Sequence, residues 1–229
     1  DLEFTSNWRL SDRILQWNHS SFMFRRKVVD DLGGWENVRV SADTEFIWRI
    51  EAAYGKGSFK KIVPTVPMSF ALDSEGSLTR VKTTHVGTIF GGVRHYYRAV
   101  SRYWHQRHPG GLSPELQQLK DRMIPREMFD RAAPPLEVAL HLTGDCSDPD
   151  IVAAMRQRAL EAVPALAGVS HIPDPTRRHD RPDEEIRLDD TFFELLRADN
   201  VRIALLDNCE ADARVDLNPE RPAATTGED

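Results

Sequence analysis

The chain has 229 residues, of which 40% are apolar, 29% charged and 8% aromatic, so it can bury a core and does not resemble a disordered polymer. No apolar run approaches the ~18–20 residues of a membrane-spanning helix, and two cysteines, Cys146 and Cys209, exclude a disulfide-rich scaffold and a four-cysteine zinc site. The net charge of −6 is unevenly divided, because residues 1–135 carry 20 Lys and Arg against 15 Asp and Glu, whereas residues 136–229 carry 10 against 21.

The charge division predicts two units joined near Pro134-Pro135. Four elements of the first unit, residues 1–108, follow from hydrophobic spacing and from glycine and proline positions: a strand over 20–24, a helix over 41–55, a strand over 59–63 and a helix over 91–108. The last helix carries Arg94, Arg98 and Arg102 four residues apart, which predicts a basic stripe along one face. Because the chain begins at Asp1 without Met or a targeting segment, we expect it to be processed or cut from a longer protein.

A second unit is predicted over residues 136–207, after a connecting segment over 109–135 that contains five prolines and a short helix near 114–122. Its elements alternate in type: a strand over 136–142, a helix after Asp148, a strand over 169–172, a helix over 190–197 and a strand over 201–206. This β-α-β-α-β order is typical of a parallel sheet with helical crossovers, so the predicted fold class is α/β. Residues 208–229 are polar and rich in Pro, Ala, Thr and Asp, which predicts a disordered tail.

One stretch of the first unit carries a motif. An apolar run ending at Arg25-Arg26 is followed by Gly33-Gly34-Trp35, then by the acidic residues Asp43 and Glu45, by Arg49 and by Gly55. This order and spacing resemble the acceptor-side half of glycosyltransferase family 2, whose members are inverting enzymes of the GT-A fold. The resemblance covers roughly residues 18–70 and implies that residues 1–108 form the C-terminal half of a GT-A-like domain, followed by a second small α/β segment.

The resemblance also implies a function and a set of site residues. The complete enzyme would transfer a sugar from a nucleotide-diphospho-sugar donor to a hydroxyl of a glycan or similar acceptor, with inversion and with a divalent metal ion, Mg or Mn. Asp43 falls at the position of the family's catalytic aspartate. The other implied site residues are Gly34, Trp35, Glu45 and Arg49 for the substrate and His85 for the metal.

The chain departs from the family pattern at two points. The family usually has Glu immediately before its aspartate, where this chain has Ala42, and it has a nucleotide-binding half that ends in an Asp-x-Asp metal motif. Nothing before Asp43 supplies that motif, and we interpret the Asp-x-Asp at 148–150 as a helix cap. We therefore expect this chain alone to bind UDP-like donors poorly.

Asp43 suits the role of general base, because an inverting transfer needs a group that takes the proton of the acceptor hydroxyl. The alternative is that Asp43 is an ordinary N-cap of the helix that follows. Glu45 lies four residues before Arg49, so an i,i+4 ion pair explains these two residues without a substrate. Trp35 is either a platform for the apolar face of a sugar ring or a core side chain, and His85 is either a metal ligand or a structural histidine.

The remaining features also have two interpretations each. The basic stripe of helix 91–108 suits a phosphate, an anionic membrane surface or simply solvent, and Cys146 is either a reactive thiol or a small loop residue. No nucleic-acid partner is expected, because no clustered basic field or nucleic-acid-binding motif is present. The competing function is a non-catalytic interaction module with helix 91–108 as its partner surface. We expect a cytoplasmic location and leave attachment to a membrane surface open as an alternative.

Overall fold

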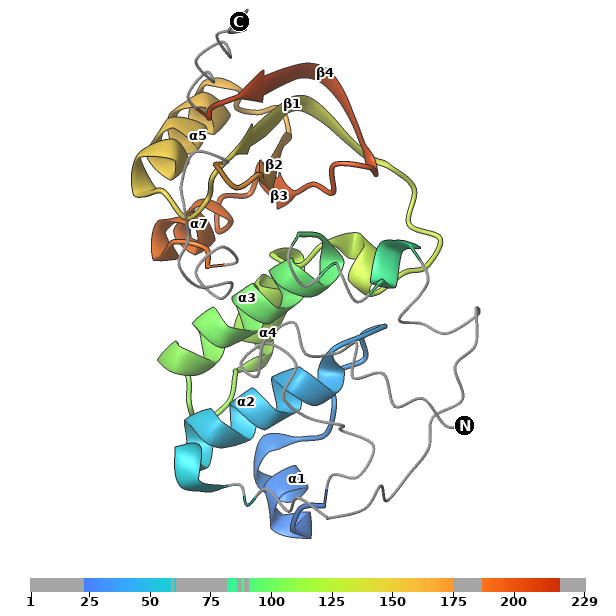
Figure 1. The fold of residues 1–229 in the computed structure, drawn as a ribbon, viewed down its shortest axis with the longest axis vertical. Coiled ribbons are helices and arrows are strands. Elements are labelled where there is room, and N and C mark those ends of the chain that lie inside the picture. Colours follow the sequence, from blue (N-terminus) through green and yellow to red (C-terminus); the bar gives the residue numbers. More distant parts are fainter. Residues whose placement is uncertain are drawn as a thin grey trace, which may run out of the picture.

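The computed structural model describes residues 23–58, 60, 82–85, 88, 91–174 and 187–218. Its helices are α1 (Arg26–Leu32), α2 (Ala42–Tyr54), α3 (Val93–Arg107), α4 (Pro114–Arg122), α5 (Pro149–Glu161) and α7 (Asp190–Leu195), with short 3-10 turns at Lys56–Ser58, Lys82–Thr84 and Arg126–Met128. Its strands are β1 (Leu136–Gly144), β2 (Ala167–His171), β3 (Val201–Ile203) and β4 (Cys209–Asp216). Figure 1 places the sheet at one end of the molecule, α3 and α4 in the middle, and α1 with α2 at the other end.

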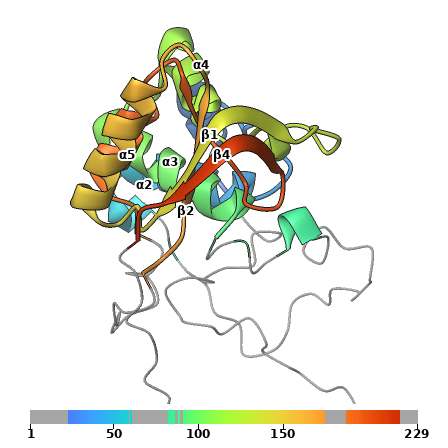
Figure 2. The ribbon, with the colours of Figure 1, turned by 90° about the horizontal axis from the view of Figure 1, so that it is seen from above.

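The strands form one parallel sheet in the order β3-β2-β1-β4. β1 is central, with Leu140 opposite Ala167 of β2 and Leu136 opposite Cys209 of β4. The chain passes from β1 to β2 through α5, which lies along one side of the sheet in Figure 2, and α7 precedes β3. The predicted α/β class is therefore confirmed for the part of the chain that the structure describes.

The predicted tail over 208–229 is wrong in its first part. Cys209–Asp216 forms β4, which pairs with β1 from Leu136 to Thr143. β4 lies at the edge of the sheet and most of its side chains are at least partly exposed, so its polar sequence reflects contact with solvent rather than disorder. Backbone pairing, which composition does not report, holds the strand in place. Residues 219–229 lie outside the described residues.

The caps of two helices agree with the sequence. The Asp148 side chain accepts a hydrogen bond from the N–H of Asp150 at 2.8 Å, and Pro149 begins α5. The Asp-x-Asp segment is therefore a helix cap, as expected. Ser113 caps α4 by accepting from the N–H of Leu116 at 3.3 Å.

α3 is the central element of the fold. Its buried residues Val93, Tyr97 and Trp104 belong to the same apolar cluster as Leu142 of β1 and Phe192 of α7. The core thus continues across the proline-rich segment that the sequence suggests as a boundary. A difference in charge between the two halves does not divide the core, because charged side chains are mostly on the surface while apolar burial is indifferent to net charge.

Two further contacts join α3 to the elements of the sheet. Tyr103 stacks on Phe193 with ring centroids 4.4 Å apart, and the backbone N–H of His171 donates to the Tyr96 hydroxyl at 2.7 Å. Because a buried hydroxyl needs a hydrogen-bond partner, Tyr96 fixes the position of β2 relative to α3.

Two predicted strands, over 20–24 and 59–63, fall mainly outside the described residues. Met23, Phe24 and Lys60, which are described, are in irregular structure. Among the helices that the structure describes, none combines the length and the apolar character needed to cross a membrane.

Candidate functional site

Arg49 ties the glycine loop to α2. It lies two turns into the helix, and its guanidinium donates to the backbone carbonyl of Leu32 at 2.7 Å and to that of Gly34 at 2.9 Å. Gly33 has a φ of 76°, in the left-handed region that favours glycine, which allows the sharp bend after α1. The Gly-Gly turn and the helix arginine of the motif therefore act together to hold the loop against α2.

Glu45 is completely buried between α2 and α3. Arg49 donates to its carboxylate from Nε at 3.0 Å and from Nη2 at 2.7 Å, and Nε2 of His105 lies 2.6 Å from Oε1. The predicted i,i+4 ion pair is thus confirmed. The predicted substrate contacts of Glu45 and Arg49 do not fit this structure, since the Glu45 side chain has no exposed surface and that of Arg49 is 12% exposed.

A second pair of charges lies beside the first. Lys120 of α4 is completely buried; its ammonium group pairs with Glu36 and lies 3.9 Å from Oε1 of Glu45. Tyr97 of α3 donates to the other oxygen of Glu36 at 2.8 Å. We call the following residues the buried ion network: Glu36, Glu45, Arg49, His105 and Lys120.

The buried ion network connects the glycine loop, α2, α3 and α4. Sequence reasoning identified Glu45 and Arg49 but missed its other members. His105 is 60 positions from Glu45, and Lys120 is 84 positions from Glu36. No local spacing rule reports such pairs, and a lysine in the last turn of an amphipathic helix is ordinary, so the sequence carried no signal for Lys120.

Opposing effects set the protonation of the network. Burial by itself raises the pKa of the Glu45 carboxyl, but the hydrogen bond from His105 and the charges of Lys120 and Arg49 together hold that pKa below its ordinary value. Burial, followed by the charges of Glu36 and Glu45, raises the pKa of Tyr97 far above its ordinary value. Glu45 is therefore an anion and Tyr97 a neutral donor over the physiological pH range.

Asp43 differs from these residues because its side chain is partly exposed, in the first turn of α2. Its Oδ1 accepts from the backbone N–H of Thr44 at 2.7 Å. The N-cap position belongs to Ser41, which makes no capping bond through its side chain, so the interpretation of Asp43 as the N-cap is wrong. Ser41, two residues before Asp43, accepts a hydrogen bond from Nη1 of Arg94 at 3.3 Å, so the start of α2 lies beside the basic stripe of α3.

The Trp35 ring packs against two neighbouring rings but is not a core side chain. Its ring makes edge-to-face contacts with Phe24 and Phe46, at centroid distances of 6.2 Å and 6.0 Å, yet 58% of the residue is exposed. Phe46 follows Asp43 by three residues and is therefore its neighbour on the helix surface. Trp35 thus presents an exposed aromatic surface close to the turn that carries Asp43.

The metal site that the resemblance implies is not formed by the described residues. No group of three or more His, Cys, Asp or Glu side chains in this part of the chain could hold a metal ion. His85 is exposed, follows the turn at Lys82–Thr84 and belongs to no such group there. We therefore assign no chemical step to a metal.

The carboxyl edge of a parallel sheet is a second place where ligands commonly bind. Here Asn218, which follows β4, bonds to the segments that follow β1 and β2. Its Oδ1 accepts from the N–H of Asp145 at 2.7 Å, and its Nδ2 donates to the carbonyl of Ile172 at 3.2 Å. The adjacent Cys146 is buried, and burial, followed by the charge of Asp145, raises the pKa of its thiol well above the ordinary value. This environment opposes the interpretation of Cys146 as a reactive thiol.

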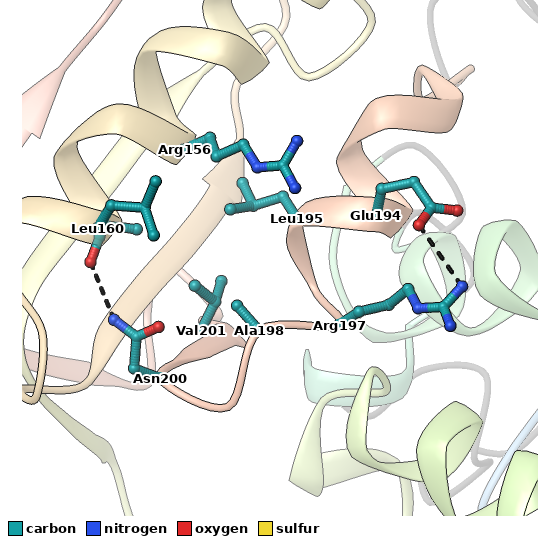
Figure 3. Close-up of a pocket in the computed structure, with 9 residues that line it drawn as sticks. Arg156, Leu160, Glu194, Leu195, Arg197, Ala198, Asn200 and Val201 are labelled. Carbon is teal, nitrogen blue, oxygen red and sulfur yellow. Dashed lines mark hydrogen bonds and ion pairs between the residues drawn. The ribbon is translucent and has the colours of Figure 1, made fainter.

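A cavity of about 310 Å³ lies between α5, α7 and the start of β3 (Figure 3). Arg156 of α5 and Arg197, which follows α7, reach it from different elements, and Arg197 pairs with Glu194 at 3.5 Å. Nδ2 of Asn200 donates to the carbonyl of Ala159 at 2.9 Å. None of the site residues predicted from the sequence lines this cavity, so it is separate from the region around Asp43.

Comparison of the chain with protein-family models, curated proteins and solved structures found no match.

Proposed function

We propose that the region around α2 is the acceptor side of an inverting glycosyltransferase of the family 2 type, with Asp43 as the general base. In the proposed reaction, Asp43 takes the proton of an acceptor hydroxyl as that oxygen attacks the anomeric carbon of a nucleotide-diphospho-sugar. The new bond forms between the acceptor oxygen and the sugar, and the bond to the diphosphate breaks, with inversion at the anomeric carbon.

One observation carries the proposal: the residues of the motif divide into an internal scaffold and an accessible carboxylate. Arg49 and Glu45 lie inside and hold the Gly34 carbonyl and the glycine loop, whereas Asp43 keeps a partly exposed side chain at the start of the same helix. A catalytic group benefits from such an arrangement, because rigid neighbours fix its position without occupying it. The exposed part of Trp35 supplies an apolar surface that suits the C–H face of a pyranose.

The competing proposal, an interaction module, receives less support. It uses the aromatic, basic helix 91–108 as the partner surface, and the aromatic residues Tyr96, Tyr97, Tyr103 and Trp104 of α3 are all buried. A partner would therefore contact α3 only through its polar residues.

The substitution Asp43→Asn tests the proposal. Because the resemblance covers the acceptor side alone, the assay uses the full-length natural protein that contains this sequence, with nucleotide release from a sugar nucleotide as the readout. We expect turnover to fall by about 10²–10⁴-fold, the usual contribution of a general base, with unchanged unfolding midpoint. The matched control is Asp30→Asn, which removes an exposed carboxylate of α1. Retained turnover in Asp43→Asn, or an equal loss in the control, would contradict the proposed role.

A further inference from the structure

Three arginines of α3 form a ladder beside Asp43. Arg94, Arg98 and Arg102 recur every four residues, so they lie on one face of the helix. Arg94 and Arg98 are both partly buried where α3 packs against α2, whereas Arg102 is exposed. We call these three residues the arginine ladder.

Each rung of the ladder is held in position by a neighbour. Arg98 and Arg102 both lie over the ring of Trp48, at 5.1 Å and 4.5 Å from its centroid, where cation–π attraction fixes their direction. The guanidinium of Arg94 donates to the carbonyl of Thr84 at 2.9 Å and to Oγ of Ser41 at 3.3 Å. The charges are thus placed before any ligand arrives, which reduces the entropy that binding would cost.

Ser41 adds an unusual feature to this surface. It has a φ of 63°, which is uncommon for a residue other than glycine, and at the N-cap of α2 it makes no capping bond through its side chain. Its hydroxyl contacts Arg94 instead. The missing capping bond lowers the stability of the start of α2, and the Ser41 hydroxyl helps to position Arg94 in its place.

The three guanidinium groups also repel one another. Burial, followed by the charges of Arg102 and Arg94, lowers the pKa of Arg98 to about 10, and Asp43 acts in the opposite direction. Arg98 therefore stays charged at neutral pH, but its charge has an electrostatic cost. An oxyanion between the rungs would offset this cost, and the planar fork of arginine matches the oxygens of phosphates and carboxylates.

We propose that the arginine ladder binds a phosphate or carboxylate group of the substrate beside Asp43. This inference rests on the proposed function for its role in catalysis, but the binding itself does not require turnover. Two sources share this chemistry: the diphosphate of the sugar donor and an anionic group on the acceptor.

The first experiment measures the binding of inorganic pyrophosphate to the 229-residue chain by calorimetry at low ionic strength. Binding should occur without added divalent metal and should weaken as salt is raised, because exposed charges are screened. Arg98→Gln should weaken binding by about tenfold or more, the effect of losing one charge-assisted contact. Arg98→Lys, which keeps the charge but loses the fork, should give an intermediate loss.

Two further variants make this experiment specific. Asp43→Asn should bind pyrophosphate more tightly than the native chain, because a negative charge next to the ladder is removed. The matched control Arg158→Gln removes a half-exposed arginine of α5 and should leave binding unchanged. Absent binding, or an equal loss in Arg98→Gln and Arg158→Gln, would overturn the inference.

Kinetics of the full-length protein then identify the source of the anion. A raised KM for the donor in Arg98→Gln assigns the ladder to the diphosphate, and a raised KM for the acceptor assigns it to an anionic acceptor. Unchanged KM values for both substrates would refute the role in catalysis. If the arginine ladder binds pyrophosphate but turnover survives the substitution Asp43→Asn, the proposed function is contradicted and the binding site is still established.

Discussion

Removal of the Glu45 charge is the sharpest test of how this fold is held together. The substitution Glu45→Gln keeps the shape of the side chain but removes the anion that faces Arg49, His105 and Lys120. Lys120 keeps its closer partner Glu36, but Arg49 has little exposed surface, so water cannot fully replace the carboxylate that it loses. Breaking a buried ion pair from one side costs about 3–5 kcal/mol, because a buried charge is left uncompensated.

This loss is measurable by urea unfolding, followed by tryptophan fluorescence and far-ultraviolet circular dichroism. With a denaturant dependence of about 3 kcal/mol per molar urea, the midpoint should fall by about 1–2 M. The matched control is Glu51→Gln, on the same helix but outside the network, which should change the free energy of unfolding by less than about 0.5 kcal/mol. A cost below about 1 kcal/mol for Glu45→Gln would refute the view that the network stabilises the packing of α2 on α3 and α4.

Three further predictions follow from the described contacts. Folding lowers the pKa of Glu45 from its ordinary 4.5, so the stability that its charge contributes is present above pH 4.5 and is lost as the pH falls through the folded-state pKa. The difference in unfolding free energy between the native chain and Glu45→Gln should therefore narrow below about pH 4.5. A difference that stays constant to pH 3 would argue against this linkage. Gly144→Ala should cost about 1–3 kcal/mol, since its Cβ would lie 2.7 Å from Cγ2 of Ile151, while Gly110→Ala, with nothing within 4 Å, serves as the control in the same thermal-unfolding assay. Cys146 should react with iodoacetamide at least about a hundredfold more slowly in the native chain than in urea, because its thiol is buried and the pKa of that thiol is raised. Mass spectrometry of the peptide that contains Cys146 measures this rate. Rapid labelling of the native chain would mean that the loop after β1 is open.

Most of the helices and the strands β1, β2 and β3 could be predicted from local patterns. The apolar spacing around Phe46 and Ile50 located α2 (Ala42–Tyr54), and the sequence Asp148-Pro149 located the start of α5. Such patterns work because helix periodicity and caps are properties of adjacent residues. β4 escaped prediction, because an exposed edge strand carries polar side chains and its pairing with β1 is made by the backbone.

For the candidate site, too, local patterns located residues, and only the folded chain showed their roles. The motif singled out Asp43, Glu45 and Arg49 by order and spacing alone, and the i,i+4 pairing of the last two followed from helix geometry. The motif could not distinguish their roles, since burial is not encoded in spacing. Only the packing of α3 against α2 made Glu45 internal and left Asp43 accessible beside the arginine ladder.

The sequence by itself determined the α/β class, the position of most elements and the short list of residues on which a function can be argued. The tertiary structure decided that the basic and acidic halves share one core, centred on α3. It also decided that Lys120 and His105 meet Glu45 across 75 and 60 positions of chain. The physical reason is common to both results: apolar burial and ion pairing depend on distance in space, and distant segments come together only when the whole chain folds.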